Sequence, residues 1–140
     1  MESQIVVAGA LIVDGALLVA QRDRPPELAG RWELPGGKVA PGETDAAALT
    51  RELAEELGID VAVGRRLGDD VALSETITLR AYVVTQKCDR TAHAHDHRAL
   101  RWAGAGELDT LDWVAADRAW LPELARVMAD SASRGGTPSR

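Results

Sequence analysis

The stretch GKVAPGETDAAALTRELAEELGI, residues 37–59, decides the fold of this protein of 140 residues. It divides into a loop and a helix. The loop holds three residues that break regular structure: Gly37, Pro41 and Gly42. Thr44 then offers a side-chain oxygen for a helix N-cap, and Gly58 suits the left-handed conformation that ends many helices. The pattern predicts a helix over Thr44–Leu57.

The predicted helix has two distinct faces. Its apolar stripe consists of leucines at four-residue spacing: Leu49, Leu53 and Leu57. Glu52, Glu55 and Glu56 share another face, where their negative charges repel one another. A bound cation would relieve this repulsion, and ligands that are all oxygen atoms suit Mg²⁺ or Mn²⁺. A glutamate cluster alone is more often a solvated helix face, so the helix by itself leaves both interpretations open.

The whole stretch resembles the Nudix box, whose pattern is G-x5-E-x7-R-E-U-x-E-E-x-G-U with U apolar. Every defined position is matched: Gly37, Glu43, Arg51, Glu52, Leu53, Glu55, Glu56, Gly58 and Ile59. With its flanking segments, the resemblance extends over most of Gln4–Ala129. It implies an α/β (α+β) fold, an α/β/α sandwich around a mixed β-sheet with the Nudix loop-helix-loop. It also implies Mg²⁺-dependent hydrolysis of a nucleoside diphosphate linked to another moiety.

The resemblance further implies roles for residues around the helix. Glu52 and Glu56 would bind the metal, together with Glu55 and the backbone carbonyl of Gly36. Arg51 would orient a helix carboxylate. Two or three Mg²⁺ ions, or Mn²⁺ in their place, would lower the pKa of a bound water and stabilise charge on the attacked phosphorus.

The general base is less closely defined, because the carboxylate that accepts the proton of the water varies within the family. Glu52 and Glu55 are the leading candidates. Asp96 is the alternative, because the family often places a further carboxylate at this position, facing the site from outside the box.

Segments around the box predict the remaining elements. Apolar, β-branched runs indicate a hairpin of strands Gln4–Val13 and Ala16–Gln21, joined at Asp14-Gly15. Segment Arg24–Gly42 carries too many glycines and prolines for more than a short strand. Downstream, the pattern predicts strands at Val61–Leu67, Val71–Leu73, Ile77–Gln86 and Ala99–Trp102, a helical turn at Gly104–Leu108 and a helix at Ala116–Ala129. We expect one Nudix domain over residues 1–129 and a disordered tail over residues 130–140.

Composition excludes several functional classes. The net charge of −6 argues against a nucleic-acid binder, which needs a basic surface. The single cysteine, Cys88, favours a reducing compartment, so we expect the protein in the cytoplasm. The apolar run Ile5–Val13 is far below membrane-spanning length and lacks a basic leader region, so we expect no membrane association. The oligomeric state stays open.

Three further segments are similar to the MutT-type subgroup, which hydrolyses nucleoside triphosphates to a monophosphate and pyrophosphate. They are VAQR at residues 19–22, PPELAG at residues 25–30 and WELPGG at residues 32–37. Within the subgroup, the sequence is most similar to CTP pyrophosphohydrolases, including mycobacterial MutT-like enzymes. The similarity implies that Arg22 contacts phosphate or sugar and that Leu34 lines the base pocket. The alternative for Arg22 is an ordinary surface arginine.

Asp117 aligns with the position at which MutT-type enzymes that bind oxidised guanine place an asparagine against the base. An ionised carboxylate only accepts hydrogen bonds, so it suits the exocyclic amino group of cytosine. The alternative is that Asp117 caps the helix at Ala116–Ala129, and both roles could coexist.

Two other features invite a functional interpretation. Arg80 lies in mid-strand, opposite the apolar face, and needs a partner, which is either a bound phosphate or base or a neighbouring carboxylate. All three histidines, His93, His95 and His97, fall in one loop. Zinc is disfavoured there, because the alternating spacing matches no closed zinc set and no cysteine pair assists.

These observations favour Mg²⁺-dependent hydrolysis of CTP, dCTP or 5-methyl-CTP to the monophosphate and pyrophosphate. Removal of 8-oxo-dGTP is the main alternative within the enzyme class. A non-catalytic nucleotide-binding module is disfavoured by the intact glutamates. A hydrolase of ADP-ribose or dinucleotides is disfavoured because the short chain shows no extra module for a second nucleoside.

Overall fold

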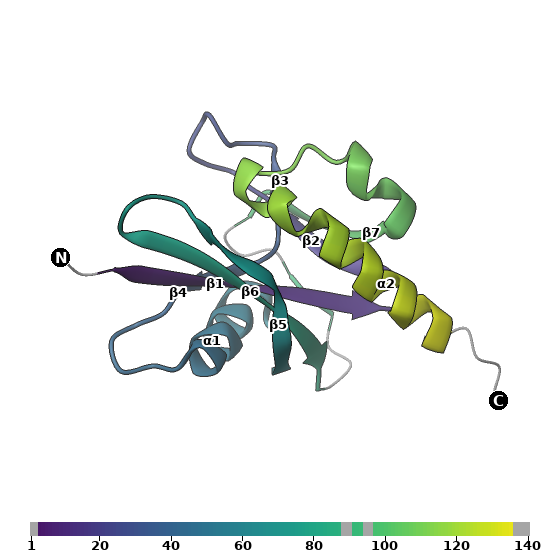
Figure 1. Ribbon diagram of the computed structural model, residues 1–140, viewed down its shortest axis with the longest axis horizontal. Coiled ribbons are helices and arrows are strands. Elements are labelled where there is room, and N and C mark those ends of the chain that lie inside the picture. Colours follow the sequence, from purple (N-terminus) through teal and green to yellow (C-terminus); the bar gives the residue numbers. More distant parts are fainter. Residues whose placement is uncertain (1–2, 88–90, 94–96, 136–140) are drawn as a thin grey trace.

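The computed structural model describes residues 3–87, 91–93 and 97–135. A seven-stranded sheet forms its centre (Figure 1). The strands are β1 Gln4–Val13, β2 Ala16–Gln21, β3 Trp32–Glu33, β4 Gly36–Lys38, β5 Val61–Ala72, β6 Ile77–Gln86 and β7 Ala99–Gly104. Their order is β3-β2-β1-β6-β5, with β4 paired to β1 and β7 paired to β2. Because β1 is parallel to β6 and antiparallel to β2 and β4, the sheet is mixed, as predicted.

Helices cover both faces of this sheet (Figure 1). They are α1 Asp45–Leu57, the 3₁₀ helices η1 Ala105–Thr110 and η2 Ala115–Trp120, and α2 Leu121–Gly135. Alternate residues of β1 point to opposite sides, so Val7 and Leu11 pack with the leucines of α1, whereas Ala8 and Ala10 join the core beneath α2. The predicted α/β/α sandwich is confirmed.

Local sequence signals set the ends of α1 as predicted. The Thr44 hydroxyl accepts a hydrogen bond from the Ala47 backbone N–H at 3.1 Å, which caps the first turn. Gly58 has a φ of 71°, and its N–H donates to the Ala54 carbonyl at 3.0 Å. Between these caps the three stripe leucines are fully buried, so the opposite, glutamate-bearing face is left for the site.

The hairpin at the start of the chain also follows its predicted form. Asp14 and Gly15 have φ values of 52° and 79°, which is the left-handed pair that a two-residue turn between twisted strands requires. The turn lets β1 and β2 lie side by side, and the segment after β2 then leads into the loop before α1.

Three predicted boundaries differ from the structure. Val61–Leu67 and the first two residues of Val71–Leu73 belong to one strand, β5, which continues through two register shifts opposite β6 and ends at Ala72. The predicted helix at Ala116–Ala129 is divided into η2 and α2, because Pro122 has no N–H to continue a helical ladder and instead suits a first turn.

The third difference concerns the predicted disordered tail. Helix α2 continues past Ala129 to Gly135, because no glycine or proline interrupts residues 130–134. Residues 136–140 lie outside the described part of the chain, as do Cys88, His95 and Asp96. No helix in the described part is long and apolar enough to cross a membrane.

Candidate active site

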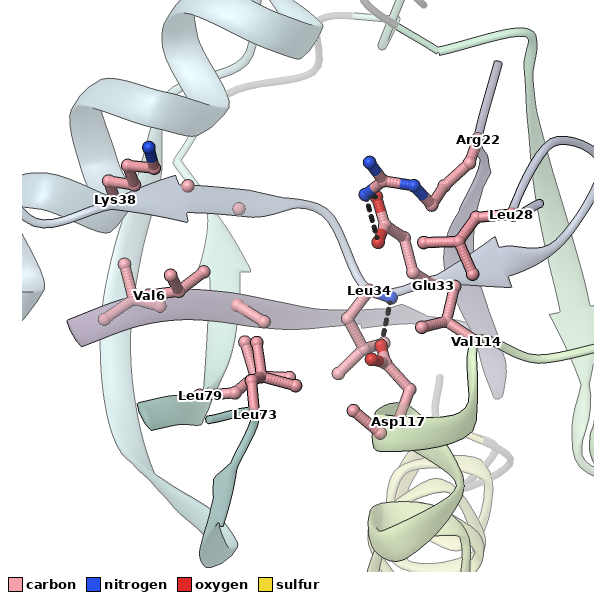
Figure 2. A pocket seen from close by; sticks show the side chains of 15 residues that line it. Val6, Arg22, Leu28, Glu33, Leu34, Lys38, Leu73, Leu79, Val114 and Asp117 are labelled. Carbon is pink, nitrogen blue, oxygen red and sulfur yellow. Dashed lines mark hydrogen bonds and ion pairs between the residues drawn. The ribbon is translucent and has the colours of Figure 1, made fainter. Parts of the chain in front are cut away.

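Two cavities meet at the loop that connects β2 to α1. An apolar pocket of about 360 Å³ is enclosed by residues of β1, the loop, β6 and η2 (Figure 2). A polar cavity of about 250 Å³ lies beside it, lined by Asp23, Arg24, Glu56 and His97. Arg22, Glu33 and Gly36 line both cavities. A ligand with an apolar ring and a charged chain could therefore occupy the two cavities together.

The apolar pocket is closed by a contact between segments far apart in the sequence. The Trp32 backbone N–H donates to the Asp112 carbonyl at 2.9 Å, and the Val114 N–H donates to the Trp32 carbonyl at 2.8 Å. This bridge sets η2 against the loop, so the Leu34 N–H donates to Asp117 Oδ2 at 2.8 Å (Figure 2). Leu34 and Asp117 thus line one pocket, and their contact with a base stays a prediction.

Asp117 is the one buried charged side chain in the described core, with 3% of its surface exposed. Burial raises the pKa of its carboxyl to about 7, and the negative charge of Glu33 acts in the same direction. The Leu34 N–H and the charge of Arg22 only partly oppose this rise in pKa. The alternative role as a helix cap is wrong, because Val114 holds the cap position of η2 and the Asp117 side chain binds Leu34 instead.

Arg22 lies where the two cavities join. Its Nη1 donates to both oxygens of Glu33, at 3.0 and 3.2 Å, and the pair stands at the rim of the apolar pocket (Figure 2). His97 Nε2 lies 2.9 Å from Glu33 Oε2, on the side of the polar cavity. Glu33 therefore fixes both an arginine and a histidine, a role that the sequence did not indicate because its partners lie 11 and 64 positions away.

Arg51 holds the glutamate face of α1 in place. Its guanidinium donates to both oxygens of Glu43, at 2.7 and 2.8 Å, and to the Lys38 carbonyl at 3.1 Å. Nη1 also donates to Glu52 Oε2 at 3.1 Å and to Glu55 Oε1 at 3.2 Å. The structure thus connects Arg51 to two helix carboxylates, where the resemblance implied one.

The same contacts stabilise the charged forms of Glu43 and Arg51. The hydrogen bond from Arg51 lowers the pKa of the Glu43 carboxyl to about 2, and the Ala40 N–H adds to the effect. Glu43 in turn raises the pKa of Arg51. The glutamate of the glycine loop therefore neutralises the arginine, a pairing that the box pattern alone does not indicate.

The glycine loop approaches both α1 and β1 closely. A Cβ on Gly37 would overlap the carboxylate of Glu52, and a Cβ on Gly36 would overlap the backbone carbonyl of Val7. Glycine at both positions lets the loop pass between the helix and the sheet with its backbone against Glu52. The Gly36 backbone therefore reaches the polar cavity that Glu56 also lines.

The donor set at this place fits a divalent metal ion in its chemistry. Gly36 and Glu56 line one cavity, and Glu52 lies beneath Gly37 with 16% of its side chain exposed. Glu55 is 61% exposed and turns toward Arg51. All these donors are oxygen atoms, which hard cations prefer. Within residues 3–87, 91–93 and 97–135, no three acidic, histidine or cysteine side chains already converge on one point.

Arg80 is the predicted substrate contact that the structure places elsewhere. It lines neither cavity, and its guanidinium donates to Asp70 at 2.9 and 3.0 Å and to Asp45 at 2.9 Å. The carboxylate alternative is therefore what the structure shows. Because Asp45 begins α1 and also accepts from the Tyr82 hydroxyl at 2.7 Å, these contacts tie the helix to β6.

Comparison with known proteins establishes the family. The family model described as NUDIX domain matches residues 3–128, and the chain belongs to this family. It is a Nudix hydrolase with pyrophosphohydrolases among its relatives, and enzymes of this family generally use divalent metals such as Mg²⁺.

Individual relatives cover nearly the whole chain. The chain is 61% identical over 136 residues to the Mycobacterium tuberculosis protein named "Putative 8-oxo-dGTP diphosphatase 2", covering 95% of this chain and 96% of that protein. It is 39% identical over 131 residues to the CTP pyrophosphohydrolase of Escherichia coli, covering 92% and 94%. The solution structure of the E. coli ORF135 protein superposes with a TM-score of 0.75 at 35% identity, covering 98% and 96%.

Proposed function

We propose that this protein hydrolyses CTP and dCTP to the monophosphate and pyrophosphate. The observation that carries the proposal is the buried carboxyl of Asp117, which faces an apolar pocket beside the glutamate helix. The similarity to a CTP pyrophosphohydrolase over 92% of the chain supports it. The same pocket would admit 5-methyl-CTP, because a methyl group suits its leucine and valine walls.

The proposed reading of the base follows from hydrogen-bond chemistry. Asp117 Oδ2 accepts the Leu34 N–H, which orients the carboxyl and leaves Oδ1 for a ligand. In its ionised form this oxygen accepts from the exocyclic amino group of cytosine and repels the carbonyl oxygen that uracil carries at the same position. One such contact discriminates between bases by about 1–3 kcal/mol.

The proposed chemistry takes place in the polar cavity. Glu52, Glu56 and the Gly36 carbonyl would hold Mg²⁺, or Mn²⁺ in its place, with Glu55 as a further ligand. When bound, the metal supplies an activated water and stabilises charge on the attacked phosphorus. Arg22 would bind the phosphate or sugar from the junction of the cavities. Arg51 orients Glu52 and Glu55, either of which would accept the proton of the water, with Asp96 as the alternative base.

A second candidate substrate is 8-oxo-dGTP. Since the pKa of Asp117 is raised to about 7, its carboxyl is partly protonated near neutral pH. A protonated carboxyl presents an O–H donor beside a carbonyl acceptor, much as the asparagine amide presents N–H donors beside a carbonyl, and could donate to a purine carbonyl. The 61% identical relative whose name refers to 8-oxo-dGTP favours this candidate.

A product assay with Mg²⁺ and purified protein separates the candidates. We expect the highest kcat/KM with CTP and dCTP, a lower value with UTP, and loss of the preference for cytosine over uracil in Asp117→Asn. A higher kcat/KM for 8-oxo-dGTP than for CTP would reject the proposal. The Glu56→Gln variant is the control: equal product formation by this variant and the wild type would indicate a binding module without catalysis. We place the reaction in the cytoplasm, on the ground of the single cysteine.

A further inference from the structure

The His97 ring is buried at the wall of the polar cavity. Its side chain is 8% exposed, and Nε2 lies 2.9 Å from Glu33 Oε2. The other ring nitrogen, Nδ1, is also buried and has no hydrogen-bond partner among the residues that the structure describes. Neither the proposed metal ligands nor the proposed base contact accounts for this histidine.

The contact with Glu33 determines what each ring nitrogen can do. A carboxylate only accepts hydrogen bonds, so the Nε2–H of His97 donates to Glu33. Glu33 is itself held by Arg22, which fixes the direction of the ring. Nδ1 is then the nitrogen left for a ligand, and a buried polar atom without a partner is unfavourable until a ligand satisfies it.

The walls of the cavity indicate which ligand would do so. Arg22 and Arg24 line the same cavity, together with the carboxylates of Asp23, Glu33 and Glu56. The N–H donors in this lining are the two arginines and His97, and a phosphate oxygen is an acceptor for such donors. A ring with hydrogen on both nitrogens donates from Nε2 to Glu33 and from Nδ1 to the phosphate oxygen.

We propose that His97 Nδ1 binds a phosphate oxygen of the substrate, with Glu33 as the positioning residue that holds the ring. This inference rests on the proposed hydrolysis of a nucleoside triphosphate, but it does not depend on which base is bound. It assigns a role in substrate binding to a histidine that lies outside the Nudix box.

Two substitutions separate binding from a merely structural role. In His97→Gln the side-chain amide nitrogen reaches the position of Nε2, so the contact with Glu33 is kept and the Nδ1 contact is lost. In His97→Asn a polar atom stays at the position of Nδ1, and the contact with Glu33 is lost. We expect the dissociation constant for inorganic pyrophosphate with Mg²⁺ to rise roughly 10- to 100-fold in His97→Gln and less in His97→Asn. A structural role predicts the reverse order, with His97→Gln close to the wild type in affinity.

The ring nitrogens can also be observed directly, by long-range ¹H–¹⁵N NMR of the histidine side chains of the wild type. Three additions are compared: Mg²⁺ alone, Mg²⁺ with cytidine, and Mg²⁺ with inorganic pyrophosphate. We expect the Nδ1 resonance of His97 to shift only with pyrophosphate. An equal shift with Mg²⁺ alone would assign the contact to metal-bound water, and no shift at saturating pyrophosphate would also overturn the inference. If the protein hydrolyses CTP but the Nδ1 resonance does not shift with pyrophosphate, this inference alone is rejected. If the resonance shifts with pyrophosphate but CTP is not hydrolysed, only the proposed substrate is rejected.

Discussion

Replacing Asp117 with asparagine should change how the stability of the protein depends on pH. The substitution keeps the shape of the side chain, and its amide oxygen can still accept the Leu34 N–H that Asp117 Oδ2 accepts in the wild type at 2.8 Å. It removes the titrating proton. The difference between the two proteins therefore isolates the effect of ionising one carboxyl that is 3% exposed.

The magnitude follows from the raised pKa. The Asp117 pKa rises from 3.8 to about 7 on folding, so between these values the folded protein holds a proton that the unfolded chain has released. Wild-type stability should therefore fall as the pH rises from about 4 to about 7, and then stay level. At about 1.36 kcal/mol per pKa unit, the loss is about 4 kcal/mol. The asparagine variant has no such loss. The unfolding free energy of the variant minus that of the wild type should therefore increase by about 4 kcal/mol between pH 4 and pH 8.

Urea denaturation of both proteins at several pH values measures this difference. The matched control is Asp112→Asn, since the Asp112 side chain is 68% exposed and its backbone makes the neighbouring bridge to Trp32. The control measures the effect of removing an exposed carboxylate at each pH, and the change at Asp117 is judged against it. If the difference between Asp117→Asn and the wild type also stayed constant from pH 4 to pH 8, the argument from burial would be refuted.

Four further predictions concern the glycine loop, the helix and the metal. Gly37→Ala should displace the Glu52 carboxylate, which should lower kcat roughly 100-fold with little change in melting temperature. Gly36→Ala should instead lower the melting temperature, because its Cβ would overlap the backbone of Val7. Equal effects of the two variants on melting temperature would contradict this reasoning. Glu43→Gln should be less stable than the wild type above about pH 4.5. The difference in unfolding free energy should vanish as the pH falls toward 2, because Glu43 becomes protonated in the folded state. A difference that does not depend on pH would argue against the contact with Arg51. Leu53→Ala should lower the free energy of unfolding by about 2–5 kcal/mol, as measured by urea titration. A loss below about 1 kcal/mol would show that neighbouring side chains move into the cavity and fill it. Chelation of divalent metal should abolish turnover, and added Mg²⁺ should restore it; unchanged product formation after chelation would exclude the proposed metal site.

The elements that the sequence predicted correctly are those whose signals are local. Thr44 and Gly58 end α1 through hydrogen bonds within a few residues, and Asp14-Gly15 sets its hairpin in the same way. The boundaries that were wrong lie where local signals are weak. The bulged part of β5 interrupts the alternation of apolar residues but not the pairing with β6, so periodicity alone divides one strand into two.

The Nudix box by itself determined the family, the α/β/α fold and the glutamate-bearing face of α1, because its signals are spaced along one loop and one helix. Tertiary structure alone decided the partners of residues that lie far apart in the chain. Arg80 binds Asp45 and Asp70 rather than lining a cavity, and Glu33 holds His97 across 64 positions. No periodicity encodes such pairs, because they form only when the sheet and loops bring distant segments together. The altered pKa of Asp117 has the same origin, since burial by η2 and the loop before α1 is a property of the folded chain.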